Sequence, residues 1–172
     1  MEQFVIKKGN HYANGEFFRI FDPNYYHYNI VSFYGTFQFM DGSWYSKVGE
    51  NSSDKNKLVG LGFGLNHHKN SVRFAWIPNY NKVGKIEIWA YWYDENDNQR
   101  KFLCEIEQYE IISYTILIYC TFYFLKIGNN IEFKIENNNK DKHFGKVLVP
   151  YFGGDLVAHQ DIHINLGFNK VK

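Results

Sequence analysis

Polar and apolar residues alternate with a period of two along most of the chain, and this alternation constrains the fold more than any other feature. In residues 85–93, KIEIWAYWY, one face of an extended chain carries Ile86, Ile88, Ala90 and Trp92. The opposite face carries Glu87, Trp89, Tyr91 and Tyr93. Similar alternation occurs in residues 71–76, 131–136 and 161–166, and no segment has the 3.6-residue period of an amphipathic helix. The pattern predicts strands with one buried and one solvated face.

The alternating segments are separated by short runs rich in Gly, Asn, Asp and Pro, which favour turns. Aromatic residues make up 20% of the chain and favour strands. We expect strands near residues 4–6, 28–39, 58–65, 71–77, 85–93, 100–107, 114–126, 131–136, 146–151 and 161–166. The predicted fold is all-β, an antiparallel two-sheet sandwich of the jelly-roll or concanavalin-like type. The length predicts a single domain over residues 1–172.

Charge and hydropathy argue against several classes of partner. The net charge is +1, from 19 Lys and Arg against 18 Asp and Glu, so we expect no nucleic-acid partner. The N-terminal MEQFVIKKGN lacks the apolar segment of a signal peptide. Residues 111–125 are uncharged but fall short of the roughly 20 residues that a membrane-spanning helix needs. We therefore expect no membrane partner and a cytoplasmic location. No cofactor is expected either.

The two cysteines fall within predicted strands. Cys120 is in phase with Ile116, Ile118, Phe122 and Phe124, which predicts one apolar strand face. Cys104 is in phase with Phe102 and Ile106. We expect two buried, reduced thiols, with a disulfide between them as the alternative.

Residues 59–65, VGLGFGL, place glycine at every second position. A phosphate-binding loop needs a helix after the glycines, and none is predicted here. In a strand, Gly60, Gly62 and Gly64 share one face, which indicates that another group lies close to the backbone. We expect an aromatic side chain of this same protein there, with a bound ligand as the alternative.

Histidines and aspartates supply the candidate polar sites. His67 and His68 fall in a predicted turn between two strands. His159, Asp161 and His163, at spacing two, would share a strand face and, with Asp155, are weak candidates for a metal site or an acid–base pair. The alternative is that residues 161–165 present the solvated face of a terminal strand, and no metal is expected.

Two segments, HHKNSVRFAW at 67–76 and VPYFGGDLVAHQDIHI at 149–164, resemble signature segments of a protein group. The group comprises uncharacterised single-domain β-sandwich proteins of Bacteroidota bacteria and their phages. DKNKLVGLGFG at 54–64 stands where that group has its preceding segment. The resemblance implies a fold and a provenance but no activity. Its phage members imply a virion-associated location as the alternative to a cytoplasmic one. His159 stands where the group has proline and Gln160 where it has histidine, so a catalytic role for that histidine does not carry over.

The leading functional hypothesis is a non-catalytic recognition or assembly module that binds a glycan or a partner protein. Its candidate surface is the aromatic face Trp89, Tyr91 and Tyr93, and the additional candidate ligand-binding residues are His67, His68 and Asp155. The face could instead be the second side of a fully buried strand. Two other functions remain open: a phage virion accessory protein held by self-association or by a capsid or tail protein, and a polysaccharide-acting enzyme on a jelly-roll scaffold.

Overall fold

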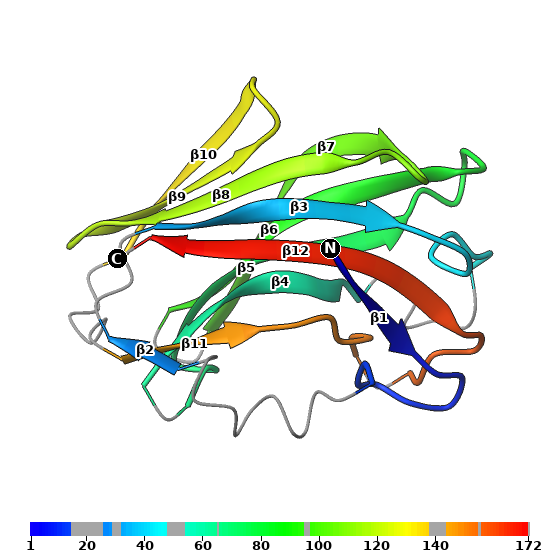
Figure 1. Ribbon diagram of the computed structural model, residues 1–172, viewed down its shortest axis with the longest axis horizontal. Helices are drawn as coiled ribbons and strands as arrows, with labels where there is room; N and C mark the ends of the chain where they lie inside the picture. Colours follow the sequence, from blue (N-terminus) through cyan, green and yellow to red (C-terminus); the bar gives the residue numbers. More distant parts are fainter. Residues whose placement is uncertain are drawn as a thin grey trace.

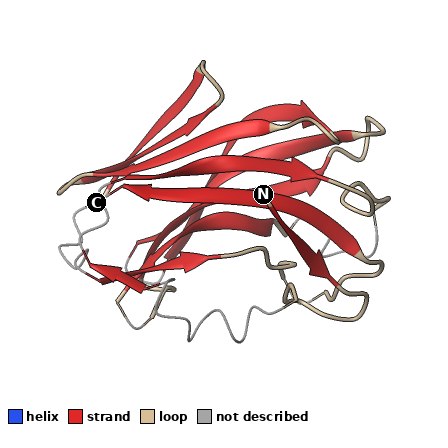
Figure 2. Ribbon diagram, in the orientation of Figure 1, coloured by secondary structure: helices blue, strands red, loops and turns tan. Residues whose placement is uncertain are grey.

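The computed structural model describes residues 1–14, 26–28, 32–47, 54–64, 66–94, 97–137, 144–154 and 156–171. In these residues the regular elements are strands, without a helix (Figures 1 and 2). The strands are β1 (Glu2–Ile6), β2 (Tyr26–Tyr28), β3 (Ser32–Phe39), β4 (Asn56–Phe63), β5 (Asn70–Pro78), β6 (Lys85–Asp94), β7 (Asp97–Glu107), β8 (Ile112–Ile118), β9 (Phe122–Ile127), β10 (Ile131–Glu136), β11 (Phe144–Leu148) and β12 (Ile162–Val171).

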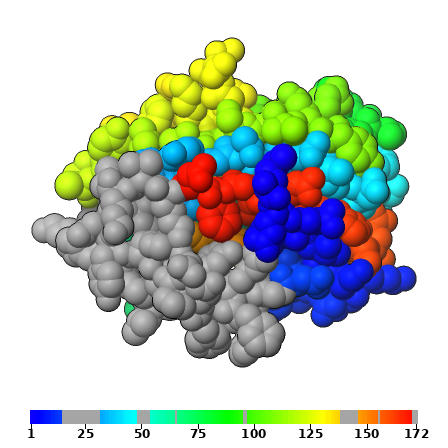
Figure 3. All heavy atoms as spheres, in the orientation of Figure 1, coloured from blue at the N-terminus to red at the C-terminus, as the bar shows by residue number. Residues whose placement is uncertain are grey.

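The strands form two antiparallel sheets. The first sheet has the order β1-β12-β3-β8-β9-β10 and the second has the order β2-β11-β4-β5-β6-β7. The first and last strands are neighbours in the first sheet, where β1 pairs with β12, and Figure 3 shows the N-terminal residues beside the C-terminal ones on the surface. The predicted all-β, two-sheet sandwich of the jelly-roll type is therefore confirmed. Over the described ranges, no helix has the length and apolar character to span a membrane.

The core lies between the sheets and is built from aromatic pairs that cross it. Phe39 of the first sheet lies 5.0 Å from Trp76 of the second, between ring centroids. The rings of Phe63 and Tyr123 stack across the core at 5.7 Å. These side chains are almost completely inaccessible to solvent. Their large apolar area and specific ring geometry hold the two sheets together.

A buried polar cluster fixes the start of β5. Asn70 Oδ1 accepts hydrogen bonds from the Tyr123 hydroxyl at 2.6 Å and from Asn137 Nδ2 at 3.2 Å. All three residues are buried, and buried hydrogen bonds of this kind favour one arrangement of the chain. Because Asn70 directly follows the turn at 66–69, the cluster also positions His67 and His68.

Two predicted strands are divided in the structure. Residues 28–39 contribute to β2 and β3, which belong to different sheets, while residues 29–31 lie outside the described ranges. Residues 114–126 form the hairpin β8–β9, closed by a hydrogen bond from Tyr119 N to Phe122 O. The turn shifts the alternation, so Tyr123 and Leu125 are buried instead of Phe122 and Phe124.

The predicted burial of Cys120 is therefore wrong, because this residue lies in the β8–β9 turn and is exposed. Cys104 is half-buried on β7, and no disulfide joins it to Cys120. The prediction of reduced thiols is confirmed and the disulfide alternative is wrong.

Candidate functional site

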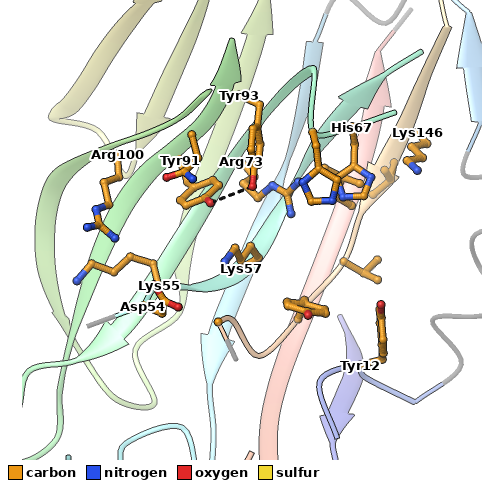
Figure 4. A pocket seen from close by; sticks show the side chains of 17 residues that line it. Tyr12, Asp54, Lys55, Lys57, His67, Arg73, Tyr91, Tyr93, Arg100 and Lys146 are labelled. Atoms are coloured by element: carbon orange, nitrogen blue, oxygen red, sulfur yellow. Dashed lines mark hydrogen bonds between the residues drawn. The ribbon is translucent and has the colours of Figure 1, made fainter. Parts of the chain in front are cut away.

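A pocket with a volume of about 530 Å³ lies on the second sheet. Its floor is the face of β4, β5 and β6 that looks away from the first sheet, as Figure 4 shows from close by. Its other lining residues come from Tyr12, Asp54 and Lys55, the turn with His67 and His68, Asn98 and Arg100 of β7, and the segment 146–154. Pockets of this volume accommodate small molecules or several groups of a larger ligand.

Strand register brings the floor residues together. Arg73 on β5 lies opposite Gly60 of β4 and Tyr91 of β6, and Tyr91 lies opposite Arg100 of β7. The neighbouring row contains Lys146, Gly62, Ser71, Tyr93 and Asn98. Directly opposed residues of antiparallel strands point to the same face. The two rows therefore place basic and aromatic side chains side by side on one surface.

A β-bulge adds Lys57 to this surface. The register of β4 against β5 shifts between Lys57 and Val59, and Leu58 and Val59 are both buried in the core. One extra residue at that point changes the alternation. Lys57 and Gly60 consequently lie on the same face, although one has an odd and the other an even number.

The glycines of β4 allow neighbouring residues to approach the backbone at the floor of the pocket. A Cβ at Gly60 would collide with Arg73 Cβ and with the carbonyl oxygen of Val72. A Cβ at Gly62 would lie 2.8 Å from His67 Cβ and 3.4 Å from the methyl groups of Leu148. The nearest neighbours are thus Arg73 and His67, and the expected aromatic side chain from a neighbouring strand is not among them. Gly64 has left the extended conformation, with φ at +68°.

The predicted solvated face of β5 is also wrong, because every residue of this strand is buried. Ser71 and Ala75 are inaccessible, and Arg73 is only 6% exposed. Arg73 and Ser71 lie beside the backbone of Gly60 and Gly62 on β4 and opposite Tyr91 and Tyr93 on β6. Ala75 lies between Lys57 of β4 and Trp89 of β6. A guanidinium is thus held at the centre of the floor, between the tyrosine pair and His67 (Figure 4).

The aromatic face of β6 lies partly inside and partly outside the pocket. Tyr91 and Tyr93 line the pocket, and the Tyr91 hydroxyl donates to the Tyr93 hydroxyl at 3.4 Å. Burial raises the pKa of Tyr91 well above its usual value, so its hydroxyl stays neutral. Trp89 lies beyond the pocket lining, with Lys55 Nζ 4.1 Å from its ring centroid and Phe102 against its edge. The face is half-covered and is not the second side of a fully buried strand.

His67 and His68 occupy the turn that the sequence predicts. The His68 amide donates to Asn66 Oδ1, and the two imidazoles lie 4.1 Å apart between centroids. Burial, aided by the charges of Arg73 and Lys146, lowers the pKa of His67 to about 3. The same causes lower the pKa of His68. His67 is therefore a neutral hydrogen-bonding group at physiological pH.

Basic side chains dominate the charge of the described lining. They are Lys55, Lys57, Arg73, Arg100 and Lys146, and the acidic lining residue is Asp54. Lys57 Nζ lies 4.8 Å from the ring centroid of Tyr91 and 6.0 Å from that of Tyr151. Burial and the nearby Arg73 lower the pKa of Lys57 to about 8. Burial also lowers the pKa of Lys55.

The weak metal candidates do not come together. The Lys7 ammonium pairs with Asp161 at 2.7 Å, and His159 packs edge-on against Tyr45. His163 lies on β12, which begins only at Ile162. Asp155 lies outside the described residues. Within the described ranges, no group of three His, Cys, Asp or Glu residues is arranged to hold a metal ion.

Sequence patterns alone missed the basic residues of the pocket and two of its tyrosines. Arg73 and Arg100 occupy the polar positions of alternating strands, which on their own predict only solvent contact. Tyr12 and Tyr151 are far apart in sequence and meet through an isolated β-bridge. The sequence signal that pointed to the pocket was glycine at alternate positions, Gly60 and Gly62, which marks β4 as a strand whose backbone other residues approach closely.

This arrangement defines an antiparallel β-sandwich with a basic, tyrosine-rich pocket on the outer face of one sheet. No family model matches the chain, and no curated protein matches it. Solved structures with the same fold include three carbohydrate-acting proteins, judged by their names. The alginate lyase from Klebsiella pneumoniae has a TM-score of 0.62 at 8% identity, over 83% of this chain and 60% of that one.

The other two are the Crh5 transglycosylase and the alginate lyase AlyC3. The transglycosylase has a TM-score of 0.57 at 10% identity, over 96% of this chain and 70% of that one. AlyC3 has a TM-score of 0.55 at 9% identity, over 83% of this chain and 65% of that one. The chain thus spans less than two thirds of both lyases. At these identities the similarity establishes the jelly-roll fold alone.

Proposed function

We propose that this protein is a non-catalytic glycan-recognition module and that the pocket on the second sheet is its binding site. The observation that carries the proposal is the pocket itself, a volume of about 530 Å³ lined by tyrosines and neutral imidazoles. Tyrosine rings offer flat apolar surface to the C–H faces of sugars, and hydroxyls and imidazoles exchange hydrogen bonds with sugar hydroxyls.

The fold neighbours support this proposal at a coarse level. Their names describe proteins that act on carbohydrates. A further structure of AlyC3, in complex with dimannuronate, is similar to this chain with a TM-score of 0.52 at 8% identity.

The test is a binding screen against neutral and acidic polysaccharides, followed by calorimetry on the best ligand. Tyr12 is 57% exposed at the pocket, so Tyr12→Ala leaves the core intact and should weaken binding about three- to tenfold. The matched control is Tyr34→Ala, which removes a 39% exposed tyrosine from β3 of the first sheet. Absence of binding to every polysaccharide would overturn the proposal. Release of new chain ends during incubation would overturn its non-catalytic part.

A further inference from the structure

We propose that the ligand of the pocket is an acidic glycan whose carboxylate or sulfate groups bind among Lys57, Arg73 and Arg100. This inference rests on the proposed glycan-recognition function and adds the chemical class of the glycan. It depends on the charge of the lining, the position of the guanidinium in the sheet, and the aromatic surface around it.

The first argument is the charge of the pocket. Five basic side chains and one carboxylate line its described part, whereas the whole chain is almost neutral. Within the described ranges, neither Lys57 nor Arg100 forms an ion pair with a carboxylate. Like charges held close together repel each other, and the repulsion is stronger where burial lowers the effective dielectric. A bound anion would relieve that repulsion, so the site favours anionic ligands over neutral ones.

The second argument is the placement of Arg73. Its strand neighbours are Gly60 and Tyr91, and Arg100 follows Tyr91 in the same cross-strand row. A cation at the floor of a pocket on a rigid central strand is positioned before any ligand arrives. The planar guanidinium can bind carboxylate or sulfate oxygens through paired N–H donors. The row therefore offers two such groups on either side of a tyrosine ring.

The third argument concerns the rest of the ligand. A volume of about 530 Å³ is far more than a single inorganic anion fills. Tyr12 and Tyr151 contact each other edge-on at one side of the pocket, and His68 contacts Tyr93 edge-on elsewhere in its lining. These rings suit sugar faces, and the neutral His67 adds a hydrogen-bonding group without further charge. An acidic sugar polymer satisfies both the cations and the rings. A nucleic acid strand is the competing polyanion, and the experiment includes it.

The experiment compares polymers with the same backbone that differ only in charge. Polygalacturonate is paired with its methyl ester, dextran sulfate is paired with dextran, and a thymidine oligonucleotide is a separate arm. Calorimetry on the intact protein should give at least tenfold tighter binding to the acidic member of one pair, weakened by added salt. The pair that responds distinguishes carboxylate from sulfate recognition.

Substitutions of single cations test which residues bind the acidic groups of the glycan. Arg100→Gln should weaken acidic-glycan binding about threefold, because Arg100 is exposed, and Lys57→Met should weaken it about tenfold. The matched control Lys101→Gln removes an exposed cation next to Arg100 in sequence but outside the pocket, and should change nothing. Equal affinity for neutral and acidic members would overturn this inference and leave glycan recognition standing. Binding to neither would overturn both, and equal or tighter binding of the oligonucleotide would assign the pocket to nucleic acid.

Discussion

Replacing Lys57 by methionine should make this protein more stable while weakening the binding of acidic glycans in the pocket. Methionine keeps most of the unbranched side chain and removes the ammonium group, which is partly buried and lies near Arg73. Burial and the Arg73 charge lower the pKa of Lys57 from 10.5 to about 8. The folded protein therefore holds this cation at a free-energy cost that the variant does not have.

The magnitude of the stabilisation follows from the pKa of Lys57 in the folded chain and in the unfolded chain. At pH 7 the ammonium is charged in both the folded and the unfolded chain, so the lowered pKa corresponds to a cost of about 3 kcal/mol in the folded state. The cation–π contact with Tyr91 is lost in the variant and offsets about 1 kcal/mol. We expect Lys57→Met to raise the free energy of unfolding by about 2 kcal/mol, or the melting temperature by roughly 4–8 °C.

The pH dependence of the free energy of unfolding tests whether the charge of Lys57 causes this difference. As pH rises from about 8 to 10.5, folded Lys57 loses its proton before unfolded Lys57 does, so the wild-type protein gains stability over this window. Urea unfolding should therefore show the advantage of the variant at pH 7 shrinking to below about 1 kcal/mol at pH 10. The matched control Lys101→Met replaces an exposed lysine and should show neither effect. A variant less stable than wild type at pH 7, or an advantage that persists unchanged at pH 10, would refute this reasoning.

Three further predictions follow from the same contacts. Gly60→Ala forces a methyl group into Arg73 and the Val72 carbonyl and should lower the free energy of unfolding by about 3 kcal/mol, measured by urea unfolding. Gly62→Ala places a methyl group 2.8 Å from His67 Cβ, which moves only with the backbone of its turn, and should lower the same quantity by about 2 kcal/mol. Acidic-glycan affinity, measured by calorimetry, should fall as pH rises from 7 to 9.5, because Lys57 loses its charge, and burial also lowers the pKa of Lys55 in the same lining. The groups around Lys57 are Asp54 on its own segment, Arg73 on β5, Tyr91 on β6, Arg100 on β7 and Tyr151 after β11. Lys57→Met should reduce the pH dependence, and an unchanged dependence in this variant would contradict the prediction. A thiol reagent at pH 8 should label the exposed Cys120 rapidly and Cys104 slowly, because burial raises the pKa of Cys104 to about 11; equal rates would contradict the assignment.

The sequence predicted the architecture and part of the site because both depend on local alternation. The period-two pattern of residues 85–93 placed Tyr91 and Tyr93 on one face, and the structure puts both in the pocket lining. The turn at His67 and His68 was predictable from its polar residues. The resemblance to Bacteroidota and phage sequences, and with it the predicted location and virion role, stays a prediction.

The rest of the site depends on pairing between distant segments. The bulge that turns Lys57 toward Gly60 exists only in the register of β4 against β5. The burial of Arg73 depends on Tyr91, which lies opposite it on β6, and on the close approach of the Gly60 backbone on β4. The turn at 119–121 that exposes Cys120 changes the alternation of β9 in a way that a continuous apolar run does not indicate.

The most direct test of the central claim is an amide chemical-shift titration of the isotope-labelled protein with a short acidic oligosaccharide from the best-binding polymer. We predict saturable shifts at the backbone amides of Gly60, Gly62, Arg73 and Tyr91, on the floor of the pocket. Shifts confined to the first sheet, around Tyr34 and Gln38 on β3, or no saturable shifts at any amide, would contradict the account.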